Sequence, residues 1–173
     1  MSEIQLRASR IQLLLTDCDG VLTDGSLHYS AAGEAAKEFH IHDGLGFKLA
    51  RLAGLKTGVI SGRQSAALEL RARELHVDYL YQGNDAKLSA YQEIRLAENL
   101  RDEQIAYVGD DLHDLNLLHR VGLAIAVANA VAEVKSAAHF VTQKGGGYGA
   151  FREAVELILK AQDKWEELLK QFH

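Results

Sequence analysis

Two carboxylates separated by a single residue follow the first apolar run of this sequence. Asp17 and Asp19 come shortly after residues 11–15 and precede the glycine-containing stretch 20–25. In open α/β sheets, ligands bind beyond the carboxyl ends of the strands, so this pair predicts a functional site. Acidic residues are also common turn formers after strands, and a purely structural turn is the alternative.

A second group of carboxylates follows a later apolar run. Asp110, Asp111 and Asp114 lie close together after the apolar residues 105–108. Such a concentration of like charge is costly unless cations lie among it. Mg²⁺ prefers oxygen ligands of this kind, so the two acidic groups together predict a magnesium site. Capping of a helix accounts for one of these carboxylates, Asp111, and not for all three.

Polar residues also follow two further apolar runs. Ser61, Gly62 and Arg63 come after residues 57–60, where a hydroxyl and a backbone N–H at the start of a helix can hold a phosphate oxygen. Serine is an ordinary helix cap as well, which is the alternative for Ser61. Lys87 stands at the start of a predicted helix, where the helix dipole disfavours a cation. It is therefore either part of a site or a solvated surface lysine.

The elements that must position these residues alternate regularly along the chain. Short apolar runs rich in branched residues predict strands, and the stretches between them have helical spacing. The predicted strands cover residues 11–15, 57–60, 79–81, 105–108, 123–127 and 140–142, and the predicted helices cover 47–53, 66–75, 88–100, 112–121 and 131–137. This alternation predicts a three-layer α/β fold, with a Rossmann-like parallel sheet covered by helices on both faces.

One interval departs from the alternation and predicts a β-hairpin. Residues 27–41 contain two short strand-like pieces, 27–30 and 37–41. We expect this hairpin to project from the sheet. The interval between Asp17 and Ser61 is too short for a cap domain in addition to the crossover helix that parallel strands require. The site is therefore expected to lack a cap and to stand open to water.

The C-terminal part of the chain predicts one long amphipathic helix. Residues 149–172 place six apolar side chains on one helical stripe: Phe151, Val155, Ile158, Trp165, Leu169 and Phe172. The stripe extends past the last predicted strand, so we expect the helix and tail at 150–173 to need a packing partner. No linker or repeat divides the sequence, which predicts a single domain spanning residues 1–173.

Composition and charge exclude several classes of function. Lys and Arg number 19 against 24 Asp and Glu, and the net charge of -5 argues against a nucleic-acid partner. No run approaches the roughly 18 apolar residues of a membrane helix, so no membrane role is expected. The N-terminus lacks the pattern of a secretory signal, which predicts a cytoplasmic location. The single cysteine, Cys18, has no partner for an internal disulfide.

Taken together, the polar segments resemble the motifs of the haloacid dehalogenase-like superfamily. Its members have an Asp-x-Asp after the first strand, then a Ser or Thr, a Lys, and an acidic Gly-Asp-Asp motif, in the order found here from Asp17 to Asp114. The resemblance implies that Asp17 attacks phosphorus and forms an aspartyl-phosphate. It also implies that Asp19 protonates the leaving oxygen and then activates water for hydrolysis.

The resemblance implies roles for the other motif residues as well. The implied Mg²⁺ site consists of Asp17, Asp19 through its main-chain carbonyl, Asp110 and the nearby Asp114. Substrate contacts are implied for Asp19, Gly62, Arg63 and Lys87. Ser61 would bind a phosphoryl oxygen, and Lys87 would neutralise charge. This agrees with physical expectation, because a carboxylate nucleophile and a phosphate dianion repel each other until cations offset the charge.

A closer resemblance is to the capless subgroup of sugar-acid phosphatases in that superfamily. The residues that carry it are 17–25, 42–46, 61–63, 82–83, Lys87 and 146–153. It implies hydrolysis of a small phosphorylated sugar acid, 3-deoxy-D-manno-octulosonate 8-phosphate, in lipopolysaccharide precursor synthesis. It also implies a homotetramer in which the hairpin and residues of a neighbouring subunit cover the site.

Alternatives remain at this stage. A nine-carbon sugar acid 9-phosphate of the neuraminate type is a second possible substrate. A phospho-receiver signalling domain also uses aspartates, Mg²⁺ and a lysine, but its acceptor aspartate follows the third strand and not the first. An inactive relative is a third possibility, although every catalytic position is filled. The residue that meets the substrate carboxylate is open too, with Arg63, Lys48 and Arg71 as candidates.

Two further segments have both a functional and a structural interpretation. His40 and His42 lie on one face of a predicted strand, where they either bind a transition metal or are exposed hairpin residues or substrate contacts. The glycine-rich run 145–149 is either a phosphate-binding loop or a flexible turn before the last helix, and we favour the turn. Cys18 is disfavoured as a nucleophile, because the carboxylates beside it raise the pKa of its thiol.

Overall fold

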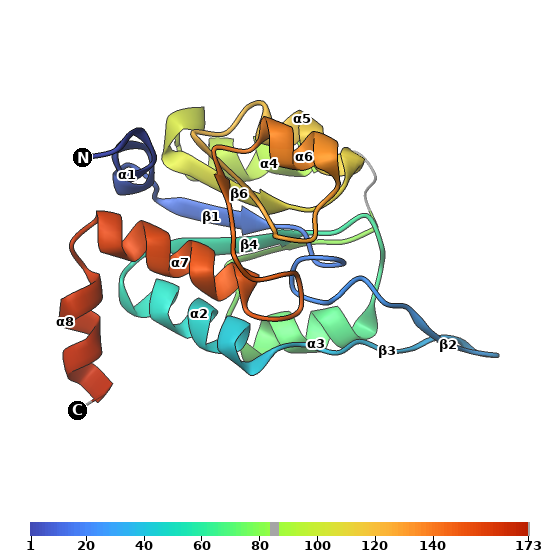
Figure 1. The fold of residues 1–173 in the computed structure, drawn as a ribbon. Coiled ribbons are helices and arrows are strands. Elements are labelled where there is room, and N and C mark those ends of the chain that lie inside the picture. Colours follow the sequence, from blue (N-terminus) through green and yellow to red (C-terminus); the bar gives the residue numbers. More distant parts are fainter. Residues whose placement is uncertain (84–86, 173) are drawn as a thin grey trace.

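The computed structural model describes residues 1–83 and 87–172 and arranges them in three layers (Figure 1). Within these residues, the main sheet has six parallel strands in the order β5-β4-β1-β6-β7-β8. They are β1 (Leu13–Thr16), β4 (Lys56–Ile60), β5 (Tyr79–Tyr81), β6 (Ile105–Gly109), β7 (Leu123–Ala126) and β8 (Phe140–Val141). The predicted α/β fold with a parallel sheet is confirmed.

Helices cover both faces of the sheet (Figure 1). One face carries α2 (Ile41–Leu52), α3 (Ala66–Glu74) and α7 (Ala150–Ala161), and the other carries α4 (Lys87–Ala97), α5 (Leu115–Leu118) and α6 (Ala132–Ala137). Short 3-10 turns, η1 (Asp102–Gln104) and η2 (Leu112–Asp114), flank β6. None of the helices in the described ranges has the length and apolar character needed to cross a bilayer.

Burial explains why the strands are continuous apolar runs. All residues of β1, β6 and β7 are buried, as expected for a parallel sheet that is covered on both faces. On one face, α2 and α7 pack closely through the stacked rings of Phe47 and Phe151, whose centroids lie 4.1 Å apart. Gly46 permits this approach, since a Cβ at that position would lie 3.2 Å from the Cα of Arg152.

The register of the sheet fixes where the functional side chains meet. Thr16, the last residue of β1, is paired with Val59 of β4 on one side and with Val108 of β6 on the other. The residues that follow these strands therefore begin at the same edge of the sheet. Asp17 continues the pairing, because its N–H donates to the carbonyl of Val108 at 3.0 Å.

The β-hairpin is present but shorter than predicted. It consists of β2 (His28–Ser30) and β3 (Gly33–Ala36), which pair antiparallel and project from the body (Figure 1). The prediction of a second strand at 37–41 is wrong. Gly33, with a φ of 108°, places the turn early, so the return strand ends at Ala36.

The predicted His40 and His42 pair on a strand is also wrong. His40 is the N-cap of α2, and its side chain accepts a hydrogen bond from the N–H of His42 at 3.2 Å. The two rings meet edge to face, with centroids 4.8 Å apart. The alternating apolar residues before α2 resemble a strand pattern. The N-cap residue His40 does have extended backbone, but the helix begins at the next residue.

The C-terminal segment is not one long helix with an unpartnered face. The helix α7 ends near Asp163, which has a left-handed backbone with φ 56°, and α8 (Trp165–Leu169) and η3 (Lys170–Phe172) follow. The N–H of Lys164 donates to the carbonyl of Leu159 at 3.0 Å and closes the helix end. The apolar stripe of α7 is buried against α2 and α1 of the same chain. Residue 173 of the predicted tail lies outside the described residues.

A short N-terminal helix, α1 (Glu3–Ser9), was not predicted. Ser2 caps it in a capping box with Gln5, a pattern that the sequence Ser-x-x-Gln contains. The helix packs against α7 and β7, which completes the layer at that end of the sheet. Its low apolar content, with only Ala8 buried, explains why hydrophobic spacing did not reveal it.

Candidate active site

The carboxyl ends of β1, β4 and β6 open onto a cavity of about 340 Å³. Because these strands are parallel neighbours, the residues after them converge there. The residues that line the cavity are Asp17, Asp19, Ser61, Gly62, Arg63, Lys87, Asp110, Asp111, His113 and Asp114. The residues to which the resemblance gave catalytic, metal-binding or substrate-binding roles, Asp17, Asp19, Ser61, Gly62, Arg63, Lys87, Asp110 and Asp114, are all in this group. His113 also lines the cavity and was not predicted. Its position inside the acidic motif was the only feature of the sequence that could have indicated it.

Asp17 is held in a largely dry position. Its side chain is 12% exposed, and its Oδ1 lies 3.0 Å from Nζ of Lys87. Burial raises the pKa of Asp17 to about 6, an effect that Lys87 opposes and the charge of Asp114 increases. The carboxylate is therefore ionised at neutral pH yet poorly hydrated, which are the properties required of a nucleophile.

Lys87 is a buried charge and not a surface lysine. Its Nζ lies 2.7 Å from Oδ1 of Asp114 and 3.3 Å from the hydroxyl of Tyr107, in addition to its contact with Asp17. Burial by itself would lower the pKa of Lys87, but the carboxylates of Asp17 and Asp114 outweigh it and raise the pKa. The solvated alternative considered for Lys87 is therefore wrong, and its positive charge is fixed beside the cavity.

Asp114 connects the acidic loop to Lys87. Its Oδ1 accepts hydrogen bonds from Lys87 and from the Tyr107 hydroxyl, each at 2.7 Å. Its Oδ2 accepts from the N–H groups of Asp110 and Asp111, at 2.9 and 3.3 Å. The carboxylate thus has four donors within the protein, and it fixes both the loop that carries Asp110 and the ammonium of Lys87.

Asp110 has an oxygen for which the protein supplies no partner. Its Oδ1 is buried without a hydrogen bond among the described residues. Burial raises the pKa of Asp110 to about 8, with further contributions from the charges of Asp17 and Asp114. Gly20, with a φ of 93°, makes room for this side chain, since a Cβ there would lie 2.0 Å from its Oδ2.

These carboxylates fit a divalent cation. One oxygen each of Asp17, Asp110 and Asp114 lie within 4.8 Å of one another. Like charges this close raise each other's pKa unless a cation neutralises them, and the unpartnered Oδ1 of Asp110 points to a missing partner. An all-oxygen donor set is the one preferred by Mg²⁺. The site therefore fits the magnesium ion that the sequence predicted.

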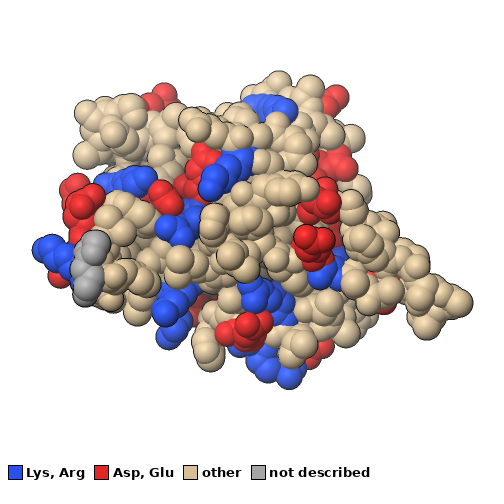
Figure 2. Space-filling view, turned by 60° about the horizontal axis from the view of Figure 1, so that its bottom comes forward, with Lys and Arg blue, Asp and Glu red and all other residues tan. Residues whose placement is uncertain are grey.

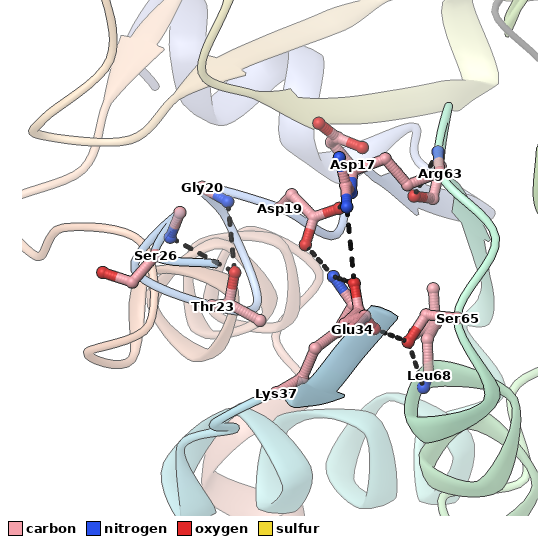
Figure 3. Close-up of polar contacts among 12 residues, drawn as sticks. Asp17, Asp19, Gly20, Thr23, Ser26, Glu34, Lys37, Arg63, Ser65 and Leu68 are labelled. Carbon is pink, nitrogen blue, oxygen red and sulfur yellow. Dashed lines mark hydrogen bonds and ion pairs between the residues drawn. The ribbon is translucent and has the colours of Figure 1, made fainter. Parts of the chain in front are cut away.

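Asp19 is paired with the hairpin. Its Oδ1 forms an ion pair with Nζ of Lys37, and its Oδ2 lies 3.8 Å from Nε of Arg63 (Figure 3). The Oδ2 is buried and has no hydrogen-bond partner among the described residues. The protein therefore contacts both oxygens, Oδ1 through Lys37 and Oδ2 through the longer contact with Arg63, and the hydrogen-bonding capacity of Oδ2 is unused among the described residues.

Ser61 is placed in a loop rather than at a helix terminus. It is buried, and its N–H donates to the carbonyl of Tyr81 at 2.9 Å, which extends the pairing of β4 with β5. Its hydroxyl accepts a hydrogen bond from the N–H of Arg63 at 3.3 Å. The predicted position at a helix start is wrong, because the N-cap of α3 is Ser65. The same finding removes helix capping as the explanation for Ser61.

The hairpin brings further polar residues, which the sequence analysis missed, into contact with Asp19 and Arg63 of the cavity. Oε1 of Glu34 accepts a hydrogen bond from the Ser65 hydroxyl at 2.5 Å, and its Oε2 lies 3.4 Å from Nζ of Lys37 (Figure 3). The Tyr29 hydroxyl accepts from Nη2 of Arg63 at 2.6 Å. These contacts join segments that are distant in sequence, so neither spacing nor composition could reveal them.

The glycine-rich run 145–149 packs against the loop after β1 and is hydrogen-bonded to it. The N–H of Gly147 donates to the carbonyl of Val21 at 2.9 Å. A Cβ on Gly146 would lie 1.7 Å from the carbonyl oxygen of Gly20, so only glycine fits this contact. The interpretation as a phosphate-binding loop is not favoured, because the backbone of the run faces the protein and the run is not among the residues that line the cavity.

Asp43 anchors the same run to α2. Its carboxylate accepts hydrogen bonds from the N–H groups of Gly149, at 3.2 Å, and Arg152, at 2.9 Å. Burial raises the pKa of Asp43, and these two hydrogen bonds oppose the effect. Asp43 of the 42–46 motif therefore ties α2 to the start of α7 and, through the glycine run, to the loop after β1.

Lys48 and Arg71, the other candidates for binding a substrate carboxylate, lie outside the cavity, and so does Cys18, the disfavoured nucleophile. Lys48 lies over the ring of Phe172, with Nζ 5.9 Å from the centroid. Arg71 contacts Glu74 at 2.9 Å and is not a lining residue. Within one chain, neither of these cations reaches the catalytic cavity, and Arg63 remains as the candidate for a substrate carboxylate. Cys18 is buried in the core, and burial together with the charge of Asp19 raises the pKa of its thiol well above the usual value.

Comparison with known proteins agrees with this geometry. The protein-family model for haloacid dehalogenase-like hydrolases matches residues 50–147. The 3-deoxy-D-manno-octulosonate 8-phosphate phosphatase KdsC of Yersinia pestis is 43% identical over 160 residues, which are 92% of this chain and 86% of that protein. The KdsC of Haemophilus influenzae is 42% identical over 93% of this chain and 89% of its own length.

Solved structures give the same result. The crystal structure of 3-deoxy-D-manno-octulosonate 8-phosphate phosphatase from Moraxella catarrhalis, in complex with a magnesium ion, a phosphate ion and a KDO molecule, is similar with a TM-score of 0.96. It is 37% identical and covers 100% of this chain and 99% of that chain. The Yersinia pestis phosphatase structure has a TM-score of 0.93 at 42% identity, over 95% of this chain and 89% of that chain.

Proposed function

We propose that this chain, which belongs to the haloacid dehalogenase-like hydrolase family, hydrolyses 3-deoxy-D-manno-octulosonate 8-phosphate to the free sugar acid and phosphate. The reaction is a Mg²⁺-dependent phosphomonoester hydrolysis in the synthesis of lipopolysaccharide precursors. The observation that carries the proposal is the buried Asp17 carboxylate beside Lys87. It lies at the edge of the sheet where the acidic residues after β6 begin. The identity of the proposed substrate comes from relatives that are similar to this chain over most of its length.

In this mechanism Mg²⁺ would be held by the carboxylates of Asp17 and Asp110 and by the main-chain carbonyl of Asp19, with Asp114 nearby. Bound Mg²⁺ supplies positive charge that offsets the repulsion between the nucleophile and the phosphate dianion. Asp114 belongs to the same acidic group, but its oxygens already accept four hydrogen bonds. Its part is therefore to hold Asp110 and Lys87 in position.

The first chemical step forms a phosphoenzyme. An oxygen of the Asp17 carboxylate attacks phosphorus, a new P–O bond forms, and the bond between phosphorus and the sugar oxygen breaks. Asp19 transfers its proton to the departing oxygen, which leaves as an alcohol. Lys87 stabilises the negative charge on the transferring phosphoryl group from a fixed, dry position, where such a charge acts more strongly than in water.

The second step regenerates the enzyme. Asp19, now ionised, takes a proton from water, and the resulting oxygen attacks the phosphorus of the aspartyl-phosphate. The bond between phosphorus and the Asp17 oxygen breaks, which restores the carboxylate and releases phosphate. Ser61 and Gly62 line the cavity, and in this proposal the Ser61 hydroxyl and the Gly62 N–H bind phosphoryl oxygens during both steps. Arg63 is the proposed partner of the substrate carboxylate.

A homotetramer is part of the proposal. The hairpin has no core of its own: β2 is exposed throughout, and Leu27 and Tyr29 are 48% and 62% exposed. The projecting hairpin is nearly free of charged side chains on the face shown in Figure 2. A projection with few charges and with Leu27 and Tyr29 exposed, beside an open site, is suited to contact another subunit and to enclose the sugar. A cytoplasmic location is proposed as well, in agreement with an unpaired thiol at Cys18.

A panel of phosphate esters tests the substrate. The purified protein is assayed for phosphate release from 3-deoxy-D-manno-octulosonate 8-phosphate, a neuraminate-type nine-carbon sugar acid 9-phosphate and glucose 6-phosphate, with Mg²⁺ or with EDTA. We expect the highest kcat/KM for the eight-carbon sugar acid and no release in EDTA. A higher kcat/KM for the nine-carbon compound would replace the proposed substrate, and release in EDTA would contradict the proposed chemistry.

A further inference from the structure

We propose that Lys37 of the hairpin is a positioning residue for Asp19, holding Oδ1 of its carboxylate so that Oδ2 is the oxygen that gives and takes the proton. This inference rests on the proposed function, because it concerns the acid-base group of the same site. It adds a hairpin residue and an assignment of the two Asp19 oxygens.

The Lys37 ammonium and the Asp19 carboxylate form an ion pair in a protected position. The Lys37 side chain is 2% exposed and that of Asp19 is 18% exposed. A lysine is rarely buried without a partner, since its charge loses hydration there. The pair is therefore a built contact between the hairpin and the catalytic loop, and it differs from the exposed ion pairs on the helices of this chain.

The two oxygens of Asp19 have different surroundings. Lys37 engages Oδ1, whereas Oδ2 is buried and accepts no hydrogen bond among the described residues. The terminal torsion of an aspartate is broad, so a carboxylate without a partner samples many orientations. Contact with Lys37 on one oxygen removes that freedom. Oδ2 lies 3.8 Å from Nε of Arg63, and Asp19 lines the cavity, so we assign Oδ2 to meet the leaving oxygen and then the attacking water.

A further set of contacts fixes Lys37 itself. Oε2 of Glu34 lies 3.4 Å from Nζ of Lys37, and Oε1 of Glu34 accepts a hydrogen bond from Ser65 (Figure 3). Ser65 is the N-cap of α3, so the hairpin is attached to the start of a helix. Arg63 lies 3.7 Å from the same Glu34 oxygen. The position of Asp19 therefore depends on the hairpin through Lys37 and Glu34.

A positioning role and a merely structural role give different kinetics. p-Nitrophenyl phosphate has a leaving group that needs no proton, so its first step does not use Asp19, whereas hydrolysis of the aspartyl-phosphate still does. If Lys37 positions Asp19, its removal slows the second step alone for this substrate. Product of the first step then appears in a rapid burst. If Lys37 only supports the hairpin, its removal raises KM and leaves the pattern of steps unchanged.

The experiment compares Lys37→Met, Lys37→Gln and Lys37→Arg with the wild-type protein, in Mg²⁺, by stopped-flow release of p-nitrophenol and by steady-state turnover of the sugar-acid phosphate. Glu38→Gln, an exposed neighbour on the same segment, is the control. For the Met and Gln variants we expect kcat lower by about tenfold to hundredfold, because a displaced catalytic group costs rate on that scale. We also expect KM within about threefold and a p-nitrophenol burst close to one per site, while Arg restores much of kcat.

Several results would overturn the inference. A wild-type kcat in Lys37→Met, a change in KM alone, or a failure of Lys37→Arg to recover kcat would each remove Lys37 from the positioning role. Thermal unfolding midpoints of the variants provide a readout besides activity, and we expect them to agree with that of Glu38→Gln. Failure of the proposed substrate is distinguishable, because the wild-type protein would then hydrolyse p-nitrophenyl phosphate but not the sugar-acid phosphate, and the Lys37 comparison would still stand.

Discussion

Nζ of Lys87 lies 3.0 Å from Oδ1 of Asp17 and 2.7 Å from Oδ1 of Asp114, so one buried ammonium serves two buried carboxylates. Removal of such a partner leaves the carboxylates without compensation in a dry position. The Lys87 charge also opposes the rise in the pKa of Asp17 that burial causes. The ionised form of Asp17, which the proposed mechanism requires, is therefore favoured by this lysine.

Lys87→Met is expected to lower kcat by at least about a hundredfold, since the variant loses charge stabilisation of the transferring phosphoryl group. Lys48→Met makes the same change at a lysine outside the cavity and should keep wild-type kcat. Steady-state phosphate release measures both. A Lys87→Met protein with nearly normal kcat would show that the buried ammonium has only a structural part.

Metal exchange should separate Mg²⁺ from Ca²⁺. Chelation with EDTA is expected to abolish turnover, and added Mg²⁺ to restore it, because the acidic group of Asp17, Asp110 and Asp114 needs a cation. Ca²⁺ should bind without restoring turnover, since it prefers more ligands at longer distances and disturbs the approach of the nucleophile. Phosphate release after titration with each metal is the measurement. Equal rates in Ca²⁺ and Mg²⁺ would contradict a site of this geometry.

The contribution of Asp110 to the stability of the metal-free protein should fall as pH rises. The pKa of Asp110 is raised to about 8 by burial and by the charges of Asp17 and Asp114, while an aspartate in the unfolded chain titrates at about 3.9. Between these values the native state binds more protons than the unfolded state, so the free energy of unfolding decreases with increasing pH. The loss is complete once the pH exceeds the pKa in the folded protein.

Asp110→Asn isolates this contribution. The thermal unfolding midpoints of both proteins are measured in EDTA at pH steps of about one unit. From pH 5 to pH 8, the midpoint of the wild-type protein should fall more steeply than that of the variant. Mg²⁺ should raise the midpoint of the wild-type protein increasingly over the same range, because protons compete with the metal for the carboxylates. Parallel curves for the two proteins in EDTA would show that Asp110 does not titrate in this window.

The exposed apolar side chains of the hairpin predict an effect on assembly. Leu27→Glu places a charge on a side chain that is 48% exposed, at the base of the hairpin. If subunits meet there, the variant should have a lower average mass by light scattering and a higher KM for the sugar-acid phosphate. Glu38→Gln should leave the mass unchanged. A wild-type protein that is a fully active monomer at the assay concentration would contradict the proposed tetramer.

Much of the site was predictable because a parallel sheet converts sequence order into spatial position. Asp17, Ser61 and Asp110 each follow a buried apolar run, and such runs become adjacent strands whose carboxyl ends meet. Lys87 was also predictable as a site residue. The helix dipole disfavours a cation at the start of a helix, so a lysine at that position indicates another role. Local patterns were sufficient for these residues.

Contacts through space explain what the sequence did not reveal. Lys37 meets Asp19 only because the hairpin folds back over the loop after β1, and no periodic pattern records that path. The true end of the hairpin depends on Gly33 in a left-handed conformation, and the end of α7 depends on Asp163 in a similar one. Helical spacing continued across residue 163, so the break was not visible in the hydrophobic pattern alone.

The central claim is that Asp17 is the nucleophile of a Mg²⁺-dependent sugar-acid phosphatase. Asp17→Asn tests it most directly, because the amide has nearly the same shape but is barely nucleophilic. Phosphate release from 3-deoxy-D-manno-octulosonate 8-phosphate is measured for both proteins in Mg²⁺, together with their unfolding midpoints. We expect rapid release by the wild-type protein and a rate lower by at least about a thousandfold in a folded variant. Release by Asp17→Asn at a rate near that of the wild-type protein would contradict the account.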